Sequence, residues 1–170
     1  MRWEKLFAEI EAHAGDLARV ERDAEIQDRT EGEWAATSWR DRLAPGPISL
    51  RVAGLGRLDG NLTRITGAWL LLQTDHYEVI VNPAWVTAVS PSAMGAKQLS
   101  VLEQRMTWVH AIRMLQREGS RIHVVRVDGS SVNGTVRLAG KDFVEIQTDQ
   151  RTAEMVPYAM LAAISCRDVP

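Results

Sequence analysis

Cysteine is almost absent from this 170-residue sequence, because Cys166 is the only one. A disulfide framework is therefore excluded, and a reducing compartment is the expected location. No stretch approaches the roughly 20 apolar residues that a membrane-spanning helix needs. The N-terminus leads into an acidic amphipathic stretch, where a signal peptide would have an unbroken apolar run. We therefore expect a cytoplasmic protein with no membrane partner.

A charge excess of either sign is also lacking. The chain has 20 Lys and Arg residues and 22 Asp and Glu residues, which gives a formal net charge of −2 at pH 7. Strong binding to nucleic acid depends on excess positive charge, so the composition disfavours a nucleic-acid partner. With 45% hydrophobic residues, the chain has the composition of a globular protein that buries a core.

Catalytic and metal-binding motifs are missing as well. The four histidines form no H-x-x-x-H pair, and Cys166 stands alone. Neither a G-x-S-x-G nucleophile motif nor a G-x-x-x-x-G-K-[ST] phosphate loop occurs. We therefore predict no catalytic residue, no cofactor and no metal site, and we do not expect an enzyme.

The most informative feature that is present is an internal repeat. Residues 50–54 align with residues 125–129, which matches Arg51 with Arg126. After a turn that is one residue shorter in the second copy, residues 58–62 align with residues 132–136. An aromatic residue, Trp69 or Phe143, then precedes an apolar strand that ends on Gln-Thr-Asp in both copies. Matching elements in the same order indicate a duplication.

Each copy is preceded by apolar residues at helical spacing and consists of short strands separated by Gly, Asp and Asn turns. Gly60 and Gly134 fall inside the second strands, where a small barrel must bend sharply. An isolated barrel of this size buries little surface, so we expect a helix to cap each one. The predicted fold is α+β, mainly β: two tandem helix-plus-five-strand small barrels of SH3-like type. The predicted segments are an N-terminal helical segment (1–47), the first barrel (48–91), a linker and helix (92–120), the second barrel (121–166) and a tail (167–170).

This helix–strand–turn–strand pattern, with an aromatic-led third strand, resembles the Sm/LSm family of small barrels, including its bacterial Hfq-type members. The resemblance is best over residues 122–165 and looser over residues 48–90. It implies that edge strands pair between neighbouring barrels to form rings, and many members of the family bind single-stranded RNA. The family's RNA-binding Asn position is occupied here by Val144 or Leu70, and the last-strand motif is replaced by residues 157–160. The family's RNA site therefore cannot be carried over to this chain.

Basic residues on the predicted strands and turns are the candidate contacts for a nucleic acid or another partner. Gathered on one face, they would follow a phosphate backbone. The alternative is that they provide solubility and cover apolar surface with their stems, and the near-zero net charge favours this alternative. The candidates are Arg51, Arg64, Arg126, Arg137, Lys141 and Arg151.

Trp34 and Trp39 lie on a short helical piece before the first copy. Being five residues apart, they cannot share one helical face, so one of them is a candidate anchor for a protein partner. We interpret the chain as a non-catalytic assembly or adaptor module that forms a homo-oligomer through its edge strands and binds an unidentified protein. The alternative is a sequence-tolerant RNA or single-stranded DNA binder. A more remote one is a small-molecule hydrolase or transferase.

Overall fold

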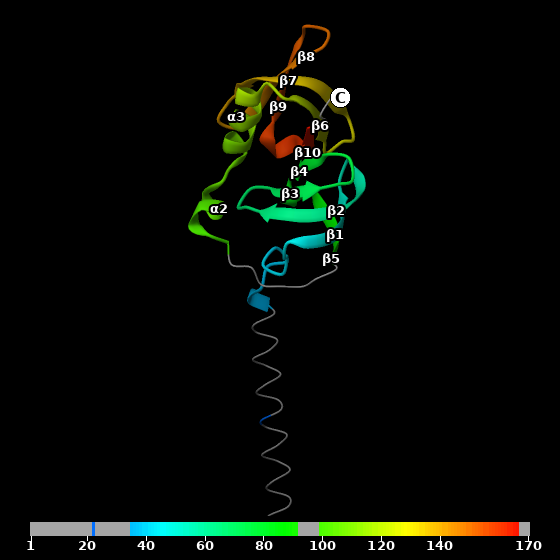
Figure 1. The fold of residues 1–170 in the computed structure, drawn as a ribbon, viewed down its shortest axis with the longest axis vertical. Coiled ribbons are helices and arrows are strands. Elements are labelled where there is room, and N and C mark those ends of the chain that lie inside the picture. Colours follow the sequence, from blue (N-terminus) through cyan, green and yellow to red (C-terminus); the bar gives the residue numbers. More distant parts are fainter. Residues whose placement is uncertain (1–21, 23–34, 92–98, 167–170) are drawn as a thin grey trace, which may run out of the picture. The chain divides into compact units, whose positions relative to one another are not determined.

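The computed structural model describes residue 22, residues 35–91 and residues 99–166. The chain divides into two compact units, Met1–Arg40 and Asp41–Pro170 (Figure 1). In the first unit, the described residues include a helical pair at positions 35 and 36, followed by an exposed turn. The predicted N-terminal stripe, Trp34, residues 92–98 of the predicted linker and the tail at 167–170 lie outside the described residues.

The second unit is built on ten strands, and its first half contains five of them. Apolar and polar residues alternate along the first two strands, so that one face of each is buried. A single 3-10 turn, η1 (Pro83–Trp85), precedes the last strand of this half. The strands are β1 (Gly46–Val52), β2 (Gly56–Ile65), β3 (Leu70–Gln73), β4 (Glu78–Val81) and β5 (Val86–Pro91).

The second half repeats this order of elements after two short helices, α2 (Val101–Arg105) and α3 (Trp108–Glu118). The 3-10 turn η2 (Tyr158–Met160) takes the place of η1. The strands are β6 (Arg121–Arg126), β7 (Ser131–Ala139), β8 (Phe143–Thr148), β9 (Ala153–Pro157) and β10 (Leu161–Cys166).

All ten strands belong to one antiparallel sheet, with the order β5-β1-β2-β3-β4-β10-β6-β7-β8-β9. The prediction of two separate barrels of five strands, each with its own helix, is therefore wrong, and the sheet is not closed. The reason lies in β4 and β10. Residues 79–81 of β4 and residues 161–165 of β10 are buried on both faces, which places both strands in the interior of the fold and not at the edge of a separate barrel. There they pair with each other (Figure 1).

The strand register corrects the alignment of the two repeats. Gly60 lies opposite Ile48, and Gly134 lies opposite Ile122, so the first strands correspond without any difference in turn length. Arg51 therefore corresponds to Val125, and Arg126 corresponds to Val52. The match of Arg51 with Arg126 was wrong by one residue.

The difference in length lies in a later turn. In the first half, the Thr74 amide donates to the carbonyl of Tyr77, whereas in the second half the Thr148 amide donates to the carbonyl of Thr152. The second turn is thus one residue longer. After it, Val79 corresponds to Glu154, and Ser90 corresponds to Ser165.

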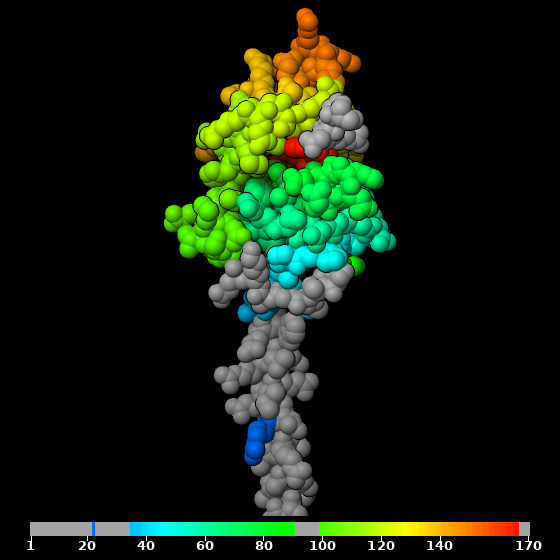
Figure 2. All heavy atoms as spheres, viewed as in Figure 1, coloured from blue at the N-terminus to red at the C-terminus, as the bar shows by residue number. Residues whose placement is uncertain are grey.

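Each half contributes side chains to the core of the other. Trp69 and Ile80, from the first half, are buried in the cluster formed mainly by the second half. Ala162 and Ala163, from β10, are buried in the cluster of the first half. Figure 2 shows the red C-terminal strand enclosed between the green first half and the yellow and orange second half. The two halves therefore form one packed body.

The helical stripe ahead of the second copy is divided into two helices. Ser100 caps α2 in a capping box with Glu103, and Thr107 begins α3 in a capping box with His110. Gly119 ends α3 with a φ of 63°, in the left-handed conformation that glycine adopts readily. Only α3 buries an apolar face, which is formed by Trp108, Ala111, Ile112 and Leu115. Within the described residues, no helix combines the length and apolar character needed to cross a membrane.

Candidate assembly interface

The junction of β4 with β10 is a strand-to-strand contact between two copies of the same unit. Its centre is the cross-strand pair of Ile80 and Ile164, whose exposed fractions are 8% and 1%. Favourable cross-strand side-chain pairs stabilise a sheet by about 0.2–1 kcal/mol each relative to a pair of alanines. The paired residues are Val81 with Ala163, Ile80 with Ile164, Val79 with Ser165 and Glu78 with Cys166.

Asn82, directly after β4, holds this junction with two hydrogen bonds to β10 and accepts a third within its own segment. Its backbone amide donates to the carbonyl of Ala162 (3.0 Å), and its side-chain Nδ2 donates to the carbonyl of Leu161 (2.9 Å). Its Oδ1 accepts a hydrogen bond from the amide of Ala84 (3.0 Å), which caps η1. Asn82 is 6% exposed, so these bonds satisfy a polar side chain inside the junction.

The outer edges of the sheet are β5 and β9, each hydrogen-bonded to a single strand within the described residues. By the repeat, β5 corresponds to β10 and β9 corresponds to β4. The sheet therefore ends, on its two sides, in the two strands that join at its centre. Unpaired edge strands carry free amide and carbonyl groups and readily add another strand.

Met155 marks the centre of the β9 edge. It corresponds to Ile80, because each of the two residues belongs to the third cross-strand pair counted from the turn before its strand. Ile80 is covered by β10, whereas Met155 is 59% exposed. On the other edge, the residue that corresponds to Ile164 is Val89, which is half-buried. The two edges thus present the apolar residues that the inner junction buries.

A shallow hollow of about 140 Å³ lies beside the β5 edge. It is lined by Ser49, Arg51, Arg57, Ala88 and Ser90, from three adjacent strands. The residues alternate along each strand, so their side chains share one face of the sheet. Two small residues on β5, Ala88 and Ser90, leave the space open toward the edge.

Asp59 fixes one of the two arginines of this hollow. Arg57 Nε donates to both carboxylate oxygens of Asp59, at 3.1 and 3.0 Å. A hydrogen bond from the Ser49 side chain, and then the bond from Arg57, hold the pKa of Asp59 below its ordinary value. Arg51 forms no ion pair within the described residues. The hollow therefore keeps one uncompensated positive charge.

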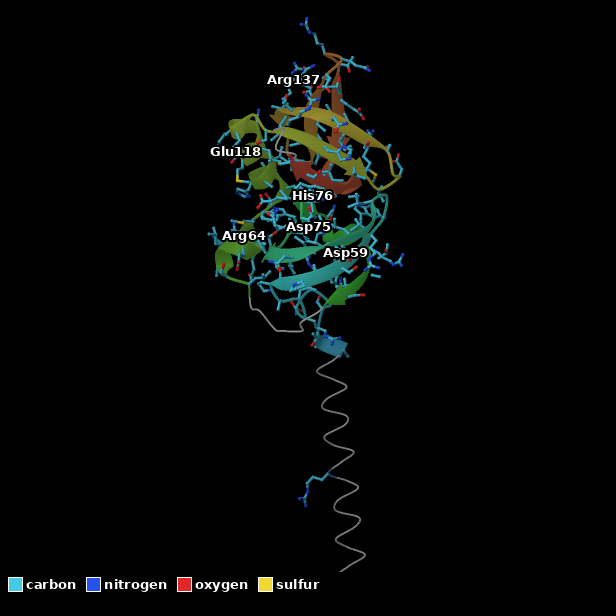
Figure 3. All side chains as sticks on the ribbon, turned by 45° about the vertical axis from the view of Figure 1, so that its right-hand side comes forward. Asp59, Arg64, Asp75, His76, Glu118 and Arg137 are labelled. Atoms are coloured by element: carbon cyan, nitrogen blue, oxygen red, sulfur yellow. The ribbon has the colours of Figure 1, made fainter. Side chains whose placement is uncertain are left out.

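The six basic candidates from the sequence do not form one surface. Figure 3 shows Arg64 and Arg137 at well-separated places, on β2 and on β7 respectively. Arg137 Nη1 forms an ion pair with Glu145 Oε1 at 2.7 Å, and Arg126 Nη1 pairs with Glu154 Oε1. The others, Arg51, Arg64, Lys141 and Arg151, are exposed.

Some interface residues were not among the candidates from the sequence. Arg57 lies on β2, directly opposite Arg51 of β1. Glu154 and Met155 lie on β9, an edge strand of the sheet. Aligning the repeats with the extra residue placed in the turn before β9 matches Glu154 with Val79, a buried residue, and that difference in character was the signal available in the sequence. Of the two predicted anchors, Trp39 is 39% exposed, and Trp34 lies outside the described residues.

Metal chemistry finds no support in the described part of the chain, which contains no group of three or more His, Cys, Asp or Glu residues placed to hold an ion. Comparison with protein-family models gives no match for this chain, and comparison with curated proteins gives none.

Proposed function

We propose that this chain is a non-catalytic assembly module that joins further copies of itself by pairing β9 of one copy with β5 of the next. The observation that carries the proposal is the β4–β10 junction, in which the same two repeat elements are already paired. Transferred to the outer edges, its register places Val89 opposite Met155 and Ser90 opposite Glu154. The flanking pairs are Ala88 with Val156 and Pro91 with Ala153.

Two further points support self-association. Met155 is exposed at the edge where its counterpart, Ile80, is buried, so pairing would remove apolar surface from water. The contact is also head-to-tail, because β9 and β5 are different surfaces. Repeating a head-to-tail contact produces a ring where the rotation closes and a filament where it does not. The resemblance of the repeats to Sm/LSm sequences, a family in which edge strands join into rings, points the same way.

The first test is size-exclusion chromatography with light scattering, with absorbance recorded for co-purifying nucleic acid. We expect a discrete oligomer, free of nucleic acid, whose size falls on dilution. We expect Met155→Asp to raise the dissociation constant at least tenfold, or about 1.4 kcal/mol, because a carboxylate would be buried opposite Val89.

Leu138→Asp is the matched control, because Leu138 is an exposed apolar residue (47%) on β7, a strand in the interior of the sheet order. It should leave the oligomer unchanged. A monomeric parent protein at all concentrations would overturn the proposal. So would an oligomer that disappears on nuclease treatment, since that result would assign the assembly to bound nucleic acid.

A further inference from the structure

The inner junction and the outer edges differ in residue type at two equivalent positions, one on each side of the junction. In the inner junction, Val79 lies opposite Ser165, which is two residues along β10 from Ala163 and its neighbour Val125. Val79 and Val125 are buried, with exposed fractions of 2% and 6%. The corresponding residues at the outer edges are Glu154 on β9 and Arg51 beside β5. Two buried apolar positions in one junction thus correspond to two oppositely charged residues in the other.

The hollow beside β5 lies where this glutamate would arrive. In the transferred register, Glu154 of the second copy stands opposite Ser90, and Arg51 stands opposite Ala88 on the next strand. Two strand spacings and two residue rises separate the Cα atoms by roughly 12 Å, which a glutamate and an arginine side chain span together. The small side chains of Ala88 and Ser90 leave the path open.

Within a single copy, before any pairing, Arg51 and Glu154 are each able to take a further charged partner. Arg57 is held by Asp59, whereas Arg51 has no carboxylate partner within the described residues. On the other edge, Arg126 pairs with Oε1 of Glu154, which leaves Oε2 for a second donor. The Glu154 side chain is 38% exposed, so it is partly desolvated before any partner arrives. Charge pairs of this kind contribute more to orientation and association rate than to affinity alone.

We infer that Glu154 of one copy enters the hollow beside β5 of the next copy and forms an ion pair with Arg51. This inference rests on the proposed assembly of β9 with β5. It adds a direction to that assembly, because pairing β9 with another β9 would bring two Glu154 carboxylates to one junction. Pairing β5 with another β5 would leave both Arg51 side chains without a carboxylate from the other copy. Opposite charges therefore favour the head-to-tail contact over the two self-pairings.

The test is a charge exchange followed by light scattering and sedimentation at several salt concentrations. Arg51→Glu should weaken assembly by at least an order of magnitude, because two carboxylates would then meet in the hollow. Adding Glu154→Lys together with Arg126→Glu, which keeps the ion pair of those two side chains with its charges reversed, should restore assembly to within a few-fold of the parent. Arg51→Met, which removes the charge and keeps an unbranched stem, should assemble more weakly than the parent and with a flatter dependence on salt.

Arg64→Glu is the control, since it makes the same charge change at an exposed position on β2, the strand next to the one that carries Arg51. Circular dichroism of each variant checks that the sheet is intact. If the parent assembles and Met155→Asp dissociates it, but Arg51→Glu assembles with unchanged affinity and salt dependence, the ion pair is refuted and the edge pairing stands. If the parent does not assemble at all, the proposed function fails first.

Discussion

Gly134→Ala is expected to lower the free energy of unfolding by about 3 kcal/mol, a large effect for one methyl group. A Cβ at this position would lie 2.1 Å from the carbonyl oxygen of Gln147 and 2.8 Å from Cγ2 of Ile146. Gly134 lies on β7 opposite Thr148 of β8, so the obstructing atom belongs to the backbone of the neighbouring strand and cannot rotate away. Relief requires the two strands to separate, which disrupts their ladder. Urea denaturation of the two proteins measures the difference.

Gly60→Ala is the matched comparison, because Gly60 is the counterpart of Gly134 in the first half. Its Cβ would meet the carbonyl oxygen of Gln73 at 2.8 Å, a milder overlap, and the next contact is 3.4 Å away. We expect a loss of about 1 kcal/mol. Equal losses at the two positions, or a gain at Gly134, would contradict the view that close strand approach requires glycine there.

Asn82→Asp is expected to destabilise the fold by about 4 kcal/mol at neutral pH, although the two side chains have the same shape. Asn82 Nδ2 donates to the carbonyl of Leu161 at 2.9 Å, and the substitution would place a carboxylate oxygen against that carbonyl. The bond from the Ala84 amide to Oδ1 would be kept, so the loss reports on the β4–β10 junction alone. The measurement is the free energy of unfolding of parent and variant.

The pH dependence distinguishes this mechanism from a simple loss of packing. Burial beside a carbonyl raises the pKa of the new carboxyl group in the folded state above its unfolded value of about 3.9. The variant is therefore penalised fully above the folded-state pKa, and its deficit relative to the parent shrinks as the pH falls through that value. Asn82→Ala, which also leaves the Leu161 carbonyl unpaired, should cost about 2 kcal/mol at every pH. A deficit for Asp that equals that of Ala across the range would contradict the repulsion.

The sequence by itself predicted the local elements well, because each depends on residues close together in the chain. Alternating apolar residues and Gly, Asp and Asn turns predicted short strands in both halves, and the apolar residues at helical spacing predicted helix ahead of the second half, which the structure divides into α2 and α3. The duplication was also readable, since equivalent strands need the same pattern of buried residues. The alignment of Arg51 with Arg126 was wrong by one residue. The two halves differ in length in the turn after β8 and not in the turn between the first two strands.

The candidate interface was only partly accessible from the sequence. Arg51 was a candidate, but its place in a hollow with Arg57 depends on the alignment of three strands. Trp39 was chosen for its spacing, and only the tertiary structure assigns its exposure of 39%. Glu154 and Met155 read as ordinary residues of an apolar strand, since nothing local says that β9 lies at the edge of the sheet.

The sequence therefore determined that the chain is mostly β, duplicated, marked by a glycine inside the second strand of each copy and free of recognisable catalytic motifs. Only the tertiary structure decided that the two copies share one sheet. The local pattern of a strand that is apolar on both faces places it in the interior of the fold, but it does not say which strands are its neighbours. In this chain the neighbours are β4 and β10, which are more than 70 positions apart and come together because each leaves apolar surface that the other covers.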